Sequence, residues 1–153
     1  MKKFLLCICF LIVLFSASCG VFKTYKDTNG DDNYTLQQIT EDMIINKSGG
    51  LQISAVSSKT TKNGITNISL RVGEFNGIDE VHVFKSGSYI VTLNYNVTSG
   101  NTRLVITDGR NIIKDFKING DNQVFEFTCE RKYYLKLAGE SCEFDLSVEI
   151  KNK

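Results

Sequence analysis

The chain lacks proline and tryptophan and contains a single histidine, His82, among its 153 residues. A catalytic triad or a zinc site needs further partners at recognisable spacing, and none accompanies this histidine. GxxxxGK and GxGxxG are missing as well, so no phosphate-binding loop is predicted. We therefore interpret His82, in "VHVF", as a packed or solvated strand residue with Val81 and Val83 on the opposite face.

An excess of charge of one sign is also lacking, since the formal net charge is only +1. This balance offers no basic surface, and we predict no nucleic-acid partner. Neighbouring acidic residues occur at Asp31-Asp32, Glu41-Asp42 and Asp79-Glu80. Neighbours in a strand point to opposite faces, so Asp79 and Glu80 are not expected to act together as acid and base. We interpret all three pairs as residues of solvated turns. We predict no catalytic residue, no metal, no cofactor and no enzymatic activity.

The N-terminus has the pattern of a signal peptide. Lys2 and Lys3 provide a positive start, and the apolar run "FLLCICFLIVLF" spans only residues 4–15. A membrane-spanning helix needs roughly 20 apolar residues, so this run is too short for an anchor. We predict that residues 1–18 are a signal peptide, and its removal changes the net charge to −1.

The stretch "FSASCG" places small residues directly before Cys19 and resembles the cleavage site of bacterial lipoproteins, although Ser16 stands where leucine is commonest. The resemblance implies that the Cys19 sulfur carries diacylglycerol and that Cys19 becomes the mature N-terminus. Each buried CH₂ contributes roughly 0.8 kcal/mol, and two acyl chains suffice for stable attachment. We predict a protein held on the extracytoplasmic face of the cell membrane. Ordinary secretion after cleavage at Ser18 and a retained anchor are the alternatives.

Residues 19–34 are polar and turn-rich without an apolar period, and we predict a flexible tether there. Within them "DTNGDDN" puts Asp27, Asn29 and Asp31 at the first, third and fifth positions of an EF-hand-like calcium loop. The sixth position is Asp32 instead of glycine, and the twelfth is Gln38 instead of glutamate. A solvated linker is therefore favoured over a calcium site.

The predicted folded domain spans residues 35–153 and begins with a short helix at about 35–47. Leu36, Ile39 and Met43 repeat with helical spacing, Thr35 and Gln38 form a capping box, and Gly49-Gly50 ends the pattern. The alternative is that "MIINK" forms an additional edge strand.

From about residue 51 the apolar period becomes two, which indicates half-buried strands. Turn residues occur between the alternating segments at "SGN", "DGRN", "NGDN" and "AGES". This rhythm predicts an all-β fold, a two-layer antiparallel sandwich of about eight or nine strands. The apolar members of the segments are Ile68, Leu70, Val72, Tyr89, Val91, Leu93, Tyr95, Val97, Phe125, Phe127, Cys129, Tyr133, Leu135, Leu137, Phe144, Leu146, Val148 and Ile150.

The alternation predicts a final hairpin with a type II′ turn at Gly139-Glu140. This register places Leu137 opposite Cys142 and Lys136 opposite Glu143 on the outer face.

The same register separates Cys129 from Cys142 by the length of a strand. A disulfide needs Cα atoms within about 7 Å, so we predict two buried free thiols.

At "DGRN", a two-residue turn would put the following apolar residues on the wrong side, which requires a bulge or a longer loop.

Three segments, "EFNG", "SGSYIVTLNYNVTSGNTRLVI" and "YYLKLAGESCEFDLSVEI", together resemble the jelly-roll-like sandwich domain of small bacterial surface lipoproteins. The resemblance covers about half the chain and implies a fold, not a site. Most aromatic residues occupy the alternate strand positions that face inward, which favours a role in core packing. Tyr134, beside Lys136, is the exception and occupies an outward position. We therefore predict a non-enzymatic, lipid-anchored interaction domain of the cell envelope with an unidentified protein or glycan partner. A glycan-binding module is the alternative.

Overall fold

The computed structural model describes residues 39–153, with only the backbone for residues 49–54. It contains the short helix α2 and six strands, all paired in antiparallel fashion. The all-β fold predicted from the sequence is confirmed. The elements are α2 Glu41–Asn46, β1 Gly49–Lys62, β2 Ile65–Phe84, β3 Gly87–Thr107, β4 Ile112–Phe116, β5 Gly120–Cys129 and β6 Tyr133–Asn152.

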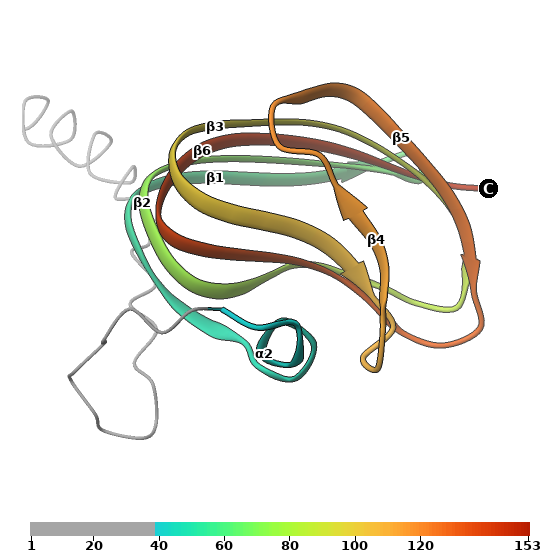
Figure 1. Cartoon of the computed structure of the whole chain (residues 1–153). Helices are drawn as coiled ribbons and strands as arrows, with labels where there is room; N and C mark the ends of the chain where they lie inside the picture. Colours follow the sequence, from blue (N-terminus) through green and yellow to red (C-terminus); the bar gives the residue numbers. More distant parts are fainter. Residues whose placement is uncertain (1–38) are drawn as a thin grey trace, which may run out of the picture.

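The strands form one sheet that folds back on itself. Its order is β1-β2-β6-β3, after which β4 pairs with the C-terminal part of β3 and β5 with the N-terminal part. Figure 1 shows β2, β3 and β6 curving together at the left of the view, so that each strand runs through both layers. A sandwich therefore arises from six strands, three of them 20 or 21 residues long, where the sequence predicts about eight or nine strands.

We name the two layers after the elements that only one of them contains. The α2 layer comprises residues 77–84 of β2, 101–107 of β3, 133–139 of β6, and β4, with α2 on its outer side. The β5 layer comprises residues 55–62 of β1, 65–72 of β2, 87–97 of β3, 142–152 of β6, and β5.

Irregular pairing marks the bend between the layers. The register shifts between Val72 and Gly77 in β2 and between Val97 and Asn101 in β3, at the level of Gly139–Glu143 in β6. An extra residue in a strand bends it, and it also reverses which alternate side chains face inward. In β6 the inward residues are accordingly odd-numbered before the bend and even-numbered after it, as Leu137 and Phe144 illustrate.

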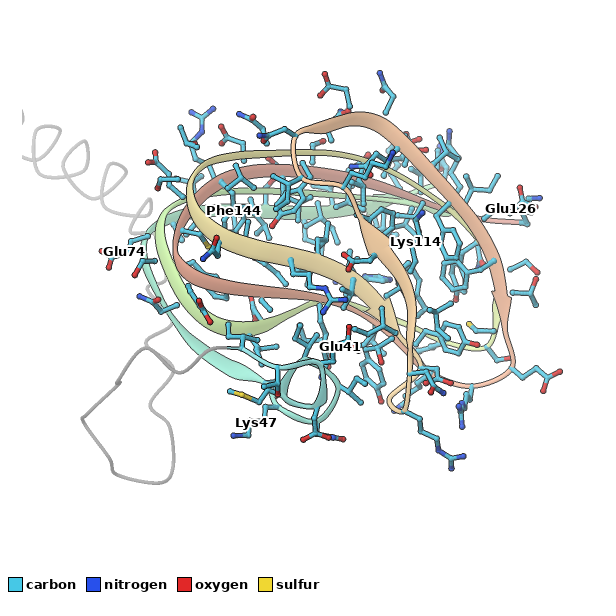
Figure 2. All side chains as sticks on the ribbon, viewed as in Figure 1. Glu41, Lys47, Glu74, Lys114, Glu126 and Phe144 are labelled. Carbon is cyan, nitrogen blue, oxygen red and sulfur yellow. The ribbon has the colours of Figure 1, made fainter. Side chains whose placement is uncertain are left out.

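The space between the layers is filled by one apolar cluster. Aromatic side chains from β2, β3, β5 and β6 contact one another there. Phe84 contacts Tyr89 and Phe127 edge to face, and the Phe127 ring stacks on Tyr133 with the ring centres 5.7 Å apart. Figure 2 shows Phe144 inside the bend and Glu74 on its outside. The buried members are Ile68, Val72, Phe75, Phe84, Tyr89, Val91, Leu93, Tyr95, Leu104, Ile106, Phe116, Cys129, Leu135, Leu137, Cys142, Phe144, Leu146, Val148 and Ile150.

Helix α2 covers the outer side of the α2 layer. Thr40 is its N-cap, accepting a hydrogen bond from the Met43 amide, so the helix begins later than the predicted residue 35. The proposed capping residues Thr35 and Gln38 lie outside the described residues. The edge strand considered for "MIINK" is wrong, since residues 43–46 are helical. Ile44 packs on the sheet with Ile78, Val105 and Ala138.

Polar contacts fix the helix at both ends. Lys136, which is 6% exposed, donates to the carbonyl oxygens of Ile45 (2.9 Å) and Lys47 (3.1 Å) at the helix C-terminus. These carbonyls carry the negative end of the helix dipole and attract a cation. At the other end, Arg103 bridges Glu41 in the first helical turn and Asp115 in β4. The predicted pairing of Lys136 with Glu143 is wrong, because Lys136 lies opposite Glu80 and Val105.

The predicted hairpin at Gly139-Glu140 is wrong, because β6 continues through this point without a turn. Ser141 adopts a positive φ of 46°, and a bulge there reverses the inward parity as a hairpin would. The "SGN" turn is wrong for the same reason, since β3 runs through it. "DGRN" does connect β3 to β4, and the bulge required near Asp108 lies between Ile106 and Thr107. Of "NGDN" only Asn119 lies between β4 and β5, and the other three residues belong to β5.

Cys129 and Cys142 are both free and buried, in agreement with the sequence-based expectation. The Cys129 thiol donates to the Lys85 carbonyl at 3.0 Å, and the Cys142 thiol donates to the Phe75 carbonyl at 3.6 Å. Burial raises the pKa of both thiols, which keeps them protonated and unreactive near neutral pH.

The bend predicts that alanine substitution destabilises the protein much more at one glycine than at another that has nearly the same φ. Gly100 (φ 75°) lies in the bend, where an added Cβ would meet the Ser141 carbonyl oxygen and lie 2.6 Å from the Cys142 Cα. Gly64 (φ 76°) lies in the β1–β2 turn, where an added Cβ meets nothing within 4 Å. Gly64→Ala should cost about 1 kcal/mol for its positive φ alone, and Gly100→Ala a further ~1–3 kcal/mol for overpacking. Urea denaturation measures both, and equal losses would contradict the assignment of the bend.

Candidate functional site

A polar groove of about 390 Å³ crosses the outer face of the β5 layer next to the bend. Four neighbouring strands contribute to it, and its floor is therefore continuous hydrogen-bonded sheet. The lining residues are Val56 and Ser58 of β1, Ser69, Leu70 and Arg71 of β2, Asn94 and Asn96 of β3, and Asp145, Leu146 and Ser147 of β6.

The outward side chains of the groove form two rows across the strands. The register places Arg71 opposite both Val56 and Asp145, and Asp145 opposite Asn96. One pleat further along, a second row is made of Ser58, Ser69, Ser147 and Asn94. Neighbouring strands lie about 4.8 Å apart, and successive outward residues about 6.7 Å apart, so the groove presents a regular grid of polar groups.

One ion pair lies in the middle of the first row. The Arg71 Nε donates to the Asp145 Oδ1 at 2.7 Å, and this hydrogen bond raises the pKa of Arg71. The two side chains are 78% and 48% exposed. Ion pairs at such exposure contribute little to stability, because solvent screens them. The charges cancel each other, and both groups retain donor and acceptor capacity toward solvent.

Amide side chains fix the edge of the groove next to β5. The Asn94 Oδ1 accepts a hydrogen bond from the Asn122 amide at 2.6 Å, and the Asn119 Oδ1 accepts one from the Val97 amide at 2.7 Å. These bonds hold the β4–β5 turn, which contains Asn119, and the start of β5, which contains Asn122, against β3. Both asparagines have a positive φ.

The residues that line the groove do not form a catalytic constellation. Its lining contains serines and asparagines, one aspartate and one arginine, without histidine or cysteine. A serine nucleophile would need a neighbouring general base to accept its proton, and the one carboxylate already accepts from Arg71. Donors and acceptors on a rigid floor suit recognition of a polar ligand.

His82 lies away from this groove, in the α2 layer. Its ring is 4.8 Å from that of Phe84, and among the described residues no hydrogen-bond partner reaches its buried Nδ1. Burial lowers its pKa to about 4, with a smaller contribution from the positive charge of Lys59. The side chain is therefore neutral at pH 7 and is a packed residue, as the sequence suggested.

The other residues considered from sequence do not assemble into a site. Tyr134 is half-buried, with the Lys136 ammonium 5.8 Å from its ring centre. The interpretation of the acidic pairs as turn residues is wrong for Glu41-Asp42, which lie in α2, and for Asp79-Glu80, which lie in β2 with Glu80 opposite Lys136. Asp31-Asp32 lie outside the described residues. Cys19 and the calcium-loop candidates Asp27, Asn29 and Asp31 lie outside the described residues. Within residues 39–153, no three His, Cys, Asp or Glu side chains gather as metal ligands would, and no helix is long and apolar enough to cross a membrane.

Sequence reasoning missed the groove. Its residues come from four strands that are far apart in the chain, and only the register brings them together. A weak signal was present, since outward positions 69, 71, 94, 96, 145 and 147 are all polar.

Comparisons with known proteins add little to this description. No protein-family model and no curated protein matches the chain at a significant level. Among solved structures, the crystal structure of a cupin domain from Bordetella pertussis Tohama I is similar over 67% of this chain and 97% of that chain. The TM-score is 0.37 at 13% sequence identity, and at these values the likeness carries no argument about function.

The lowered pKa of His82 predicts a pH-dependent loss of stability. Between the ordinary pKa of 6.5 and about 4, the unfolded chain binds a proton that the folded chain does not, so stability falls as the pH falls through this window. When the pH is lowered from 7 to 4.5, the free energy of unfolding of the His82→Gln variant should fall by about 1–2 kcal/mol less than that of the wild type. This value allows for the partial exposure of His82. Urea denaturation at both pH values measures the difference, and parallel losses would contradict it.

Proposed function

We propose that the protein is a lipid-anchored, extracytoplasmic binding domain without enzymatic activity. The observation that carries this proposal is the groove, a rigid polar surface across four strands with no nucleophile, acid or base arranged for chemistry. Such a surface holds a ligand through many weak polar contacts.

The proposal of an anchor is supported by the N-terminal sequence. A charged start, a short apolar run and small residues before Cys19 are the features of a lipoprotein signal. The described chain begins at Ile39, whose amide donates to the Glu140 carboxylate at 2.6 Å. Residues 19–38 thus connect the proposed lipid attachment to a fixed point on the domain.

The proposal of a non-enzymatic role is supported by the state of the reactive groups. Both cysteines of the folded domain are buried with raised pKa values, and the single histidine is neutral and packed. Asp108 is the one described carboxyl with a strongly shifted pKa: burial raises it, but hydrogen bonds from Asn111, Arg110 and Arg131 outweigh burial and lower it to about 2. Such a group is a structural ion in a turn, not an acid or base for catalysis at neutral pH.

The anchor is tested by labelling growing bacteria that produce the protein with radioactive palmitate. The wild type should incorporate label and sediment with the membrane fraction, because two or more acyl chains hold a protein stably on a bilayer. Cys19→Ala should lose the label entirely. Cys9→Ala is the matched control and should be labelled like the wild type, since residue 9 leaves with the signal peptide.

An unlabelled wild-type protein whose mature chain begins at Cys19 would contradict the anchor and favour simple secretion. Label retained in Cys19→Ala would contradict the assignment of the attachment site.

A further inference from the structure

We infer that the groove on the β5 layer binds a neutral oligosaccharide. This inference rests on the proposed function and deepens it, because it names the class of ligand for the same surface. It follows from the charge, the hydrogen-bonding groups and the shape of the groove.

The charge of the groove selects against ionic ligands. Its cation, Arg71, already donates to its anion, Asp145, at 2.7 Å. An acidic ligand that binds the remaining N–H groups of Arg71 would face the negative charge of Asp145, and a basic ligand that binds Asp145 would face the positive charge of Arg71. A ligand without net charge can bind both groups while they remain paired.

The side chains of the groove can both donate hydrogen bonds to hydroxyl groups and accept hydrogen bonds from them. Ser58, Ser69 and Ser147 each offer one donor and two acceptor positions, and the Asn96 amide adds two donors and a carbonyl oxygen. Sugar hydroxyls also donate and accept at once, so neighbouring hydroxyls of a ring can be satisfied by neighbouring positions of the grid. A hydrocarbon ligand would leave these polar groups without partners, which costs binding energy.

Apolar atoms in the groove match the C–H faces of a sugar ring. The Val56 side chain, 69% exposed at one end of the groove, offers an apolar surface to such a face, whereas the side chains of Leu70 and Leu146 pack into the core. The volume of about 390 Å³ lies within the usual range of small-molecule sites, ~300–1,000 Å³.

The fixed β4–β5 turn and the sheet floor make the groove preorganised. A rigid site loses little conformational entropy on binding, and this favours a ligand that is held by many weak contacts. An amphipathic helix would need a continuous apolar stripe, which this face lacks. An added strand would need a free sheet edge, and the groove lies on a face.

The inference is tested by isothermal titration calorimetry on the full protein, purified in a detergent without a sugar headgroup. The neutral probes are cellotetraose, chitotetraose, maltotetraose and β-1,4-mannotetraose, and tetragalacturonate is the acidic comparison. At least one neutral probe should bind with a sub-millimolar dissociation constant, more tightly than tetragalacturonate. The Ser69→Ala, Asn96→Ala double variant should bind it about tenfold more weakly, because two hydrogen bonds are lost.

Asn67→Ala is the matched control, since Asn67 is exposed on the same face but does not line the groove, and its affinity should stay within about twofold. Asp145→Asn leaves Arg71 without its partner charge and should increase the affinity for tetragalacturonate by about fivefold or more. Thermal unfolding of each variant establishes that the fold is retained.

The inference is overturned if no neutral probe binds at millimolar concentration, or if the groove variant and Asn67→Ala bind equally well. Tighter binding of tetragalacturonate by the wild type would indicate an acidic ligand instead, and a peptide that is displaced by none of the sugars would indicate a protein partner. These failures are distinguishable from failure of the proposed anchor, which is measured by palmitate labelling and does not depend on any sugar.

Discussion

The bend at the level of Gly100 is the constraint on which the rest of the structure depends. Three neighbouring strands place their irregular residues at the same level, so the whole sheet folds there and its halves face each other across one core. The approach is too close for an ordinary side chain, because a Cβ on Gly139 would lie 2.6 Å from the Phe75 ring. Each bulge also reverses the inward parity, so apolar residues fill the core on both sides of the bend.

The folded sheet has two outer faces, and the sequence uses them differently. On the α2 layer, outward Ile78, Val105 and Ala138 form an apolar patch, which the helix covers and Lys136 secures. On the β5 layer, most outward positions are polar or charged, and no described element covers them. A polar face needs no cover for stability, and it remains available to a ligand.

The local period of the sequence predicted the fold class but not the path of the strands. Alternation reports which residues are buried, and at 137–142 a hairpin and a bulge change the parity in the same way. The choice between them depends on β2 and β3, which bend beside β6 and are distant in sequence. A helix was predicted because its spacing is local, although of Leu36, Ile39 and Met43 only Met43 lies in α2 as described. The groove was missed because its rows exist only after four strands are in register.

The position of the chain's entry supports the use of the β5 layer for binding. Ile39 is fixed to Glu140 beside the bend, and α2 follows on the outer side of the α2 layer. The groove opens on the opposite outer face, on outward residues of the β5 layer such as Ser69 and Asn96. The described chain begins next to α2, on one outer face of the sandwich. A domain held from this end would therefore carry the groove on its other outer face. The same bend that creates the core separates the N-terminal end of the described chain from the groove proposed for binding.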